Sequence, residues 1–402
     1  MKTSIASKLI VLVVFLGVVA SLAYADEKSR HAILVFEGTR RLYGYIGTSG
    51  KIEIAPTFQE ASMFYRGAAV AGIHSPGHGP GTLRFGIIDL TGSWIIEPTN
   101  EDVFSSSLES HFWKLSDGQW VLIDSEGHQV FDMNFSEVAS FAEGKAVVRQ
   151  EGEQVVIDED GVILFSITAH GFYATPSVYY AEERLIVSQG QPAAGLRTIV
   201  FLDGEGEVAI PARTYLAGGI NPFSQGYAAL QEPAPGKIGG GEAFFIDRHG
   251  ERAFGGRVWR GVKSFSEGLA AVSTLSASPS QHRPARWGFI DRNGEMVIED
   301  IYWDVEPFSE GLAAVAVELD SLVPGNRDGL WGAIDQNGVM VIEPQFRSPF
   351  RFRDGLAQLF EPYEIHSIAG VQLSGPIRGT TMRYIDRNGR TVWDERDHRP
   401  VD

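Results

Sequence analysis

Short apolar runs alternate with turn-forming residues along most of the chain. The stretch WGFIDRNGEMVIED at Trp287–Asp300 places two β-rich runs, WGFID and EMVIE, on either side of the tetrapeptide DRNG. The same pattern returns in WGAIDQNGVMVIEP at Trp331–Pro344. Alternating apolar and polar residues on both sides of a tight, Gly-containing loop predict a β-hairpin. We therefore expect an all-β chain built from hairpins.

The Asp-x-x-Gly tetrapeptide recurs at a nearly regular interval. Counted from a degenerate copy, GTSG at Gly47, successive spacings are 42, 35, 34, 45, 44, 44, 44 and 51 residues, a period that indicates a repeat architecture. Asp in the first position can accept hydrogen bonds from the backbone N–H groups two and three residues further on, and Gly in the last position can adopt a positive φ. We therefore interpret the following residues as structural turn formers: Asp89, Asp124, Asp247, Asp291, Asp335 and Asp386, with weaker copies at Asp158 and Asp203.

A second motif keeps step with the first. FSEGLAAV occurs at Phe265 and Phe308, and related copies occur at Phe64, Phe141, Phe223 and Phe352. We expect the Phe to anchor an irregular link and its Gly to bend the chain into a third short strand, LAAV. Prolines follow the second hairpin strand, where a missing N–H is expected to end the ladder: Pro56, Pro98, Pro211 and Pro344.

One such repeat buries too few apolar side chains to offset the conformational entropy of its backbone, so neighbouring repeats must stack. Five aromatic residues are assigned to this stacking: Trp287, Trp331, Phe265, Phe308 and Phe352. The glycine after each Trp is expected to leave room for the adjacent hairpin.

Together these motifs resemble those of the WG repeat proteins. The matching elements are Trp287-Gly288 and Trp331-Gly332, the variants Tyr43-Gly44 and Phe85-Gly86, the Ile-Asp-x-x-Gly turn, the Val-Ile-Glu-Pro strand and the Phe-Ser-Glu-Gly-Leu-Ala link. The resemblance covers almost all of residues 31–393; it is clean over 223–393 and degenerate over 105–215. It implies a non-enzymatic binding or scaffold role toward a protein or a cell-envelope partner.

The expected architecture is one array over residues 26–402, made of about nine hairpin repeats stacked as an open solenoid or superhelix. A closed β-propeller is the alternative. We expect the open form because nine unequal units close less readily than they stack.

The first 25 residues differ from the rest. Lys2 and Lys8 precede the uncharged apolar run LIVLVVFLGVVA, and Ala23-Tyr24-Ala25 is a small-x-small cleavage motif. We interpret residues 1–25 as a signal peptide cleaved near Ala25, which predicts a secreted protein, periplasmic or extracellular. The sequence has no cysteine, so this exported array is expected to fold without disulfides.

Charge narrows the choice of partners. The formal net charge is −17, and loss of the signal peptide with its two lysines takes it to −19. Such a surface repels phosphate backbones and anionic lipids, so we expect no nucleic acid partner and no membrane association of the mature form.

Insertions fall at one point of the repeat, between the LAAV strand and the next Trp-Gly strand. They occupy residues 71–84, 231–242, 273–286, 317–330 and 360–382. Because each occupies the same point of its repeat, the five loops are expected to project from one edge of the array and to carry the binding function.

Candidate chemistry is sparse. His74 and His78 lie in a Gly/Pro-rich loop with three residues between them, but no cysteine or acidic partner lies near them in the sequence, so we expect no metal and no cofactor. Recognised nucleophile, zinc-protease and phosphate-loop motifs are absent from the sequence, and we expect no enzymatic activity. The possible ligand surface comprises His74, His78, Trp259, Tyr302 and Trp303, the last three as exposed stacking rings. Carbohydrate or cell-wall binding, or a carbohydrate-active hydrolase that uses loop carboxylates, is the alternative function.

Overall fold

The computed structural model describes residues 29–37, 40–74, 83–108, 111–174, 180–190, 195–234, 241–274, 286–317, 329–368 and 371–398, and the side chains of all of these except 363–378. The predicted signal peptide lies outside the described residues. Among the described residues, no helix has the length and apolar character needed to span a membrane.

The described chain consists of antiparallel β-sheets and four short 3-10 turns, which confirms the all-β class. It forms nine sheets, numbered here 1 to 9 in chain order. Sheet 1 contains β1 (His31–Glu37), β2 (Arg40–Ile46) and β3 (Ile52–Phe58); sheet 2 contains β4 (Glu60–Ala61), β5 (Ala68–His74), β6 (Leu83–Asp89) and β7 (Trp94–Thr99); sheet 3 contains β8 (Val103–Ser105), β9 (His111–Ser116) and β10 (Gln119–Asp124).

Sheet 4 contains β11 (Glu137–Val138), β12 (Lys145–Gln150), β13 (Glu153–Asp158) and β14 (Ile163–Ser166); sheet 5 contains β15 (Phe172–Tyr173), β16 (Tyr180–Ala181), β17 (Arg184–Gln189), β18 (Leu196–Leu202) and β19 (Val208–Leu216); sheet 6 contains β20 (Ile220–Ser224), β21 (Tyr227–Pro233) and β22 (Gly241–Ile246). The degenerate stretch 105–215 therefore forms the larger part of sheets 3 to 5, with one Asp-x-x-Gly turn in each.

Sheet 7 contains β23 (Gly261–Val262), β24 (Ala270–Ser273), β25 (Trp287–Ile290) and β26 (Met296–Tyr302); sheet 8 contains β27 (Asp304–Val305), β28 (Leu312–Val317), β29 (Leu330–Asp335) and β30 (Met340–Phe346); sheet 9 contains β31 (Phe352–Arg353), β32 (Leu356–Ile368), β33 (Val371–Asp386) and β34 (Thr391–Asp394). The 3-10 turns are η1 (Thr168–His170), η2 (Ala217–Gly219), η3 (Phe254–Gly256) and η4 (Glu395–His398).

Sheets 7 and 8 show the complete repeat. A short first strand is followed by the LAAV strand, by a third strand that begins with or next to Trp-Gly, and by a fourth strand after the Asp-x-x-Gly turn. Each strand pairs with its predecessor in the chain. Because successive strands reverse direction, the first-to-second and third-to-fourth turns of a sheet lie at one end, and the second-to-third connection lies at the other.

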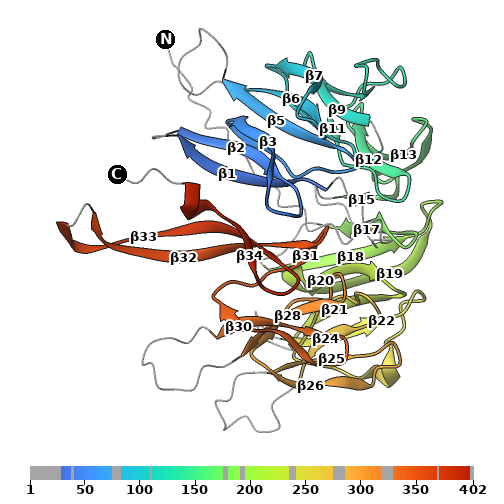
Figure 1. The fold of residues 1–402 in the computed structure, drawn as a ribbon. Coiled ribbons are helices and arrows are strands. Elements are labelled where there is room, and N and C mark those ends of the chain that lie inside the picture. Colours follow the sequence, from blue (N-terminus) through green and yellow to red (C-terminus); the bar gives the residue numbers. More distant parts are fainter. Residues whose placement is uncertain are drawn as a thin grey trace.

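The expected open solenoid is wrong, because the nine described sheets close into a ring, a nine-bladed β-propeller (Figure 1). Nine apolar clusters join each sheet to the next, and the last joins sheet 9 to sheet 1 through Ile33, Ile46, Leu356, Tyr384 and Trp393. The Tyr384 hydroxyl also donates to the carbonyl of Ala32 at 2.8 Å. An open array would leave the apolar faces of its two end sheets in water, whereas the ring buries both.

The glycine of Trp-Gly makes room within its own sheet rather than for the adjacent hairpin. A Cβ on Gly288 would lie 2.5 Å from the carbonyl oxygen of Ile298 in the paired strand β26. There Trp287 pairs with Tyr302 and Phe289 pairs with Ile298, so three residues of β26 bulge over the single glycine.

The prediction that the prolines end the ladder is wrong, because they lie at the same kind of bulge. Pro344 lies inside β30 and opposite Gly332, and pairing resumes beyond it between Phe346 and Trp331. Pro56, Pro98 and Pro211 likewise lie inside the last strands of their sheets, at bulges. A bulged residue does not need to donate to the ladder, so a proline is tolerated there and does not end the strand.

Candidate functional site

The Asp-x-x-Gly turns share one hydrogen-bond pattern. Oδ1 of Asp291 accepts from the backbone N–H of Asn293 at 2.8 Å and of Glu295 at 3.0 Å. The N–H of the glycine, three residues on, instead donates to the Asp backbone carbonyl. The acceptor pattern is therefore two and four residues on, not two and three as expected. It is the same at Asp89, Asp124, Asp158, Asp203, Asp247, Asp335 and Asp386.

These hydrogen bonds favour the ionised carboxylate. The N–H of Glu295 beside Asp291, and that of Val339 beside Asp335, lower the pKa of each carboxyl below its ordinary value. The N–H of His128 does the same for the pKa of Asp124. Both side-chain and backbone oxygens of these aspartates are thus engaged in the turn.

The glycine of the turn meets a second constraint from the preceding sheet. Gly294 has a φ of 80°, and a Cβ there would lie 2.6 Å from Cγ of Phe254 in η3, which follows sheet 6. At the ring closure, Gly50 of sheet 1 lies in the same way against the backbone of Val392 in sheet 9. The turns therefore also make inter-sheet contacts.

The Phe-Ser-Glu-Gly segment is a tight two-residue turn, not the irregular link that the sequence suggested. Ser266 and Leu269 exchange backbone hydrogen bonds, and the two residues between them, Glu267 and Gly268, have φ of 53° and 88°. Positive φ at both central positions is typical of a type I′ turn.

The side chains of this turn bind the next sheet. Oε2 of Glu267 accepts from the N–H of Gly311 at 2.8 Å, and Oγ of Ser266 donates to the carbonyl of Phe308 at 2.6 Å. The side-chain oxygen of the first central residue accepts an equivalent hydrogen bond at the other junctions between sheets 4 and 9. Glu143 accepts from the N–H groups of Glu182 and Glu183, Glu182 from that of Gly226, Gln225 from that of Gly268, and Glu310 from that of Gly355. At this end of the ring, here called the turn face, the recurring polar groups hold neighbouring sheets together.

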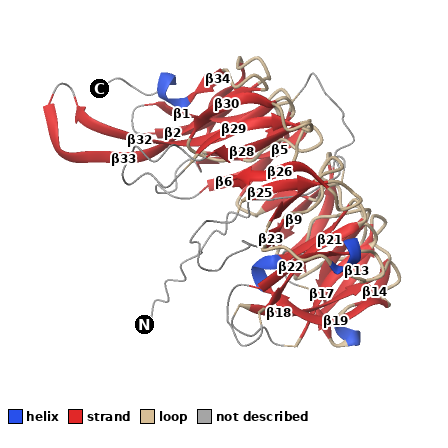
Figure 2. Cartoon of the chain, turned by 90° about the horizontal axis from the view of Figure 1, so that it is seen from below, coloured by secondary structure: helices blue, strands red, loops and turns tan. Residues whose placement is uncertain are grey.

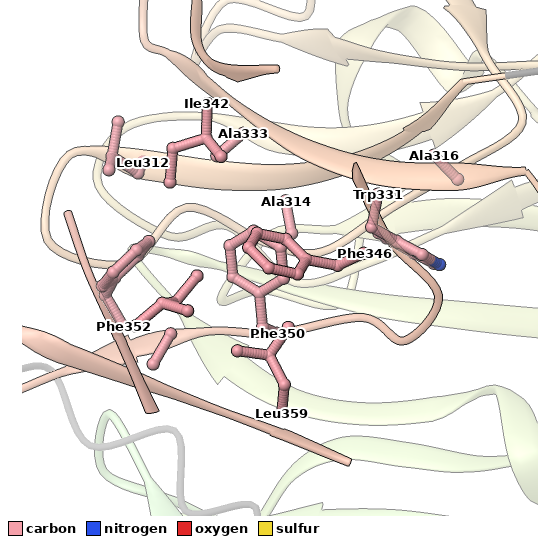
Figure 3. Close-up of a cluster of buried hydrophobic side chains, with 12 residues drawn as sticks. Leu312, Ala314, Ala316, Trp331, Ala333, Ile342, Phe346, Phe350, Phe352 and Leu359 are labelled. Carbon is pink, nitrogen blue, oxygen red and sulfur yellow. The ribbon is translucent and has the colours of Figure 1, made fainter. Parts of the chain in front are cut away.

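The five residues assigned to stacking lie between sheets. Phe265 is buried in the cluster between sheets 6 and 7, and Phe308 in the one between sheets 7 and 8. Trp331 and Phe352 are buried between sheets 8 and 9, where Phe346 and Phe350 pack edge to face (Figure 3). Trp287 is partly buried against the cluster of Phe308.

Two of the three rings predicted to be exposed are buried, so their assignment to a ligand surface is wrong. Trp259 is 3% exposed and packs against Phe245, and Tyr302 is 6% exposed in the cluster between sheets 7 and 8. The reason is positional: Tyr302 ends the last strand of its sheet on a buried aromatic, as Phe58 and Phe346 do, and Trp259 pairs with Ala243 of β22 in an isolated bridge. Trp303 is half-buried, and the guanidinium of Arg286 lies 5.0 Å from its ring centroid.

The predicted histidine pair is only partly described. His74 ends β5 with an exposed side chain, and its backbone N–H donates to Oε1 of Gln59. His78 lies outside the described residues. Within the described part of the chain, no group of three or more His, Cys, Asp or Glu side chains is arranged to hold a metal ion.

The second-to-third connections form the other end of the ring, here called the loop face. Insertions in sheets 2, 6, 7 and 8 include residues 75–82, 235–240, 275–285 and 318–328, which lie outside the described residues. The fifth insertion, 360–382, is not a loop: β32 and β33 continue through it as a paired hairpin, with a described backbone on both sides of residues 369–370. Sheets 6 to 9 are consecutive, so four of the five insertions are neighbours.

The described rim of the loop face at sheets 7 and 8 gathers cations, aromatic rings and acids. Nζ of Lys263 lies 5.2 Å from the ring centroid of Trp287 and 3.1 Å from Oδ1 of Asp304. The Thr274 hydroxyl donates to Oδ2 of Asp300. With the Arg286–Trp303 pair, these side chains form what we call the sheet 7–8 rim: Lys263, Thr274, Arg286, Trp287, Asp300, Trp303 and Asp304.

Carboxylates on this rim already have partners. Asp300 is bound by the Thr274 hydroxyl and Asp304 by Lys263, so both carboxylates are engaged in structural contacts. One small cavity in the described structure, between sheets 4 and 5, is lined by Lys145, Val156 and Tyr180 and holds about 10 Å³. That is room for about one water molecule.

Comparisons with known proteins agree with the repeat. A family model described as "WG containing repeat" matches residues 43–72, 120–153, 287–318 and 331–359. No curated protein sequence matches the chain.

Among solved structures, the chain is similar to Porphyromonas gingivalis dipeptidyl peptidase 4, with 7% identity, 90% of this chain and 65% of that chain covered, and a TM-score of 0.46. It is also similar to a structure described as a eukaryotic initiation factor, with 11% identity, coverages of 82% and 96% and a TM-score of 0.42. The Neurospora crassa Pan2 WD40 domain is similar with 12% identity, 64% of this chain and 84% of that chain covered, and a TM-score of 0.29.

Proposed function

This chain is a WG-repeat protein, and on that premise we propose that it is an exported, non-enzymatic scaffold that binds a protein partner through the loop face of sheets 6 to 8. The observation that carries the proposal is the sheet 7–8 rim, where Arg286 lies on the half-buried Trp303 beside two neighbouring insertions. Trp and Arg are the residue types that contribute most to protein–protein binding energy.

The two ends of the ring support this choice of face. On the turn face, the aspartate oxygens and the Glu-Gly turns are engaged within and between sheets. The loop face carries insertions of unequal length on a rigid scaffold, which is where binding residues are usually found. In the described residues, one exposed large hydrophobic side chain is aromatic, Phe360, so the carbohydrate alternative finds no described stacking platform.

Export rests on the sequence. The two lysines before the apolar run, the run itself and the cleavage motif Ala23-Tyr24-Ala25 support it. N-terminal sequencing of the protein from the cell envelope or the medium tests this part: a mature chain that begins at Asp26 is expected, and an intact Met1 in the cytoplasm would contradict it.

Binding is tested by quantitative capture from envelope extract with the wild-type protein and four variants. Arg286→Ala, Trp303→Ala and removal of residues 276–284 are expected to weaken capture of the same partner about tenfold or more. The deletion begins after Ser273 and Thr274, because Ser273 is buried in β24 and Thr274 binds Asp300. The matched control, Glu126→Ala in an exposed turn-face position, is expected to retain capture. Equal capture by all variants would contradict the assignment to this face.

A further inference from the structure

The hairpin β32–β33 extends far beyond the rest of its sheet and projects from the ring in both views (Figure 1, Figure 2). The neighbouring strand β31 pairs only with Leu356 and Ala357, and β34 pairs only with Arg383, Tyr384 and Ile385. From the Phe360–Met382 pair to the Ile368–Val371 pair, the two strands pair only with each other in the described structure. This outer part is called the ribbon. An isolated two-stranded ribbon is at best marginally stable in water, so it gains stability from further strands.

The two edges of the ribbon differ. The backbone N–H of Met382 donates to the carboxylate of Glu395 at 2.8 Å, so it points away from β32. Alternation along an antiparallel ladder then directs the N–H groups of Thr380 and Arg378 to the same outer edge. Across the ladder from Thr380 stands Pro362, at the matching outward position of β32. Proline has no N–H, so Pro362 separates the outward donors of β32, whereas β33 keeps two consecutive outward donors, Thr380 and Arg378, before Pro376.

Glu395 marks the point where the sheet stops. β34 ends at Asp394, and the carboxylate of the buried Glu395 takes the place of the next strand residue as the acceptor for Met382. Beyond it, no described strand lies beside β33. A strand added there would continue the line of β34 along the ribbon.

We infer that the β33 edge of the ribbon pairs antiparallel with the same edge of a second copy of this chain. Two identical strands paired antiparallel are related by a two-fold axis. The β33 edge of one copy therefore pairs with the β33 edge of the other, and the interface closes as a dimer. The product is a four-stranded sheet, which supplies the strands that each ribbon lacks.

Charge favours this contact over contact between the rings. The whole chain carries a formal charge of −17, whereas residues 363–378 contain one acidic residue, Glu364, and one basic residue, Arg378. Pairing through these neutral ribbons brings the copies together at their least repulsive segment and keeps the acidic rings apart.

Sedimentation velocity and light scattering of the purified protein up to about 100 µM test the inference. The wild-type protein is expected to have twice the mass of one chain. Thr380→Pro removes an outward donor, as Pro362 does on the opposite strand, and is expected to weaken the dimer about tenfold or more. Thr380→Ala keeps the N–H and is expected to leave the dimer unchanged. Replacing residues 364–378 by Asn-Gly closes the shortened hairpin with a two-residue turn and is expected to give a monomer with an unchanged melting temperature.

A monomeric wild-type protein, or a shortened hairpin that still dimerises, overturns the inference. Equal weakening by Thr380→Ala and Thr380→Pro overturns it too, because the backbone donor would then not be the cause. The test is separate from that of partner binding: the shortened variant is expected to retain capture of the partner, and the variant that lacks 276–284 is expected to remain a dimer.

Discussion

One oxygen atom sets the geometry of each Asp-x-x-Gly turn. Oδ1 of Asp291 accepts two backbone N–H groups and so holds the reversal of the chain from within the turn. The residue types were enough to predict a turn here. They were not enough to predict that Gly294 also meets Phe254, because Phe254 lies in η3, 40 residues before Gly294 and outside its hairpin.

Loss of the turn carboxylate lowers stability without altering the loop face. Asp291→Ala and Asp335→Ala are each expected to lower the melting temperature by about 2 °C, because two N–H groups lose their acceptor. Asp291→Asn keeps an acceptor oxygen and serves as the control. Differential scanning calorimetry, with partner capture measured in parallel, checks this; lost capture at an unchanged melting temperature would assign these residues to binding instead.

Acid sensitivity follows from the same groups. The pKa values of Asp124, Asp291 and Asp335 are lowered on folding by hydrogen bonds from backbone N–H groups, from an ordinary value of 3.8. Their contribution to the free energy of unfolding is therefore present above pH 3.8 and is lost as the pH falls through their lower pKa values in the folded protein. We expect the melting temperature to fall more steeply below about pH 4 in the wild-type protein than in the triple Asp→Asn variant. Parallel pH curves for the two proteins would refute this origin.

At the scale of the element, the turn between the first two strands joins neighbouring sheets by its side chains. Sequence reasoning found the Phe-Ser-Glu-Gly motif and its period but assigned the turn to glycine alone. The role of Glu267 was missed because its acceptor function is satisfied by Gly311, a full repeat further along the chain. The available signal was Gln225, which replaces Glu at the same position and keeps an acceptor oxygen.

Removal of that acceptor is expected to weaken one sheet interface. Glu267→Ala leaves the N–H of Gly311 without its carboxylate and is expected to cost about 1 kcal/mol of unfolding free energy. Glu267→Gln is expected to cost much less, since Gln225 makes the same bond. Urea unfolding of both variants measures the difference, and equal losses would mean that the hydrogen bond is not the source.

The loop predicted for residues 360–382 from their place in the repeat is wrong. In the structure β32 and β33 stay paired on either side of a bulge between Ile365 and Ser367. Bulges absorb glycine and proline inside strands, as the fourth strands of the repeat also show. The position of an insertion in the repeat therefore does not separate an extended hairpin from a loop.

At the scale of the whole molecule, the class of the fold could be predicted but not its closure. The repeat period and the hairpin pattern gave the number of units and their order. Closure depends on the rotation between neighbouring sheets, which is set by packing such as that of Tyr384 and Trp393 on Ile33 and Ile46. These residues are separated by most of the chain, and a local pattern contains no information about their contact.

Closure predicts cooperative unfolding. Trp393→Ala opens a cavity at the junction of sheets 9 and 1 and is expected to cost about 3–5 kcal/mol. Because this junction closes the ring, we expect the loss of stability to affect all nine sheets together. Tryptophan fluorescence and far-UV circular dichroism should then report the same single unfolding transition. A separate early transition confined to sheet 9 would indicate the independent stacking of an open array.

The junction of sheets 9 and 1 brings the two ends of the folded chain together, since η4 packs against β1. The ring architecture therefore does not require the chain to begin at sheet 1 and end at sheet 9. A genetically rearranged chain, joined by a short linker between its old ends and begun instead at the Asp117–Gly118 hairpin, should assemble the same circle.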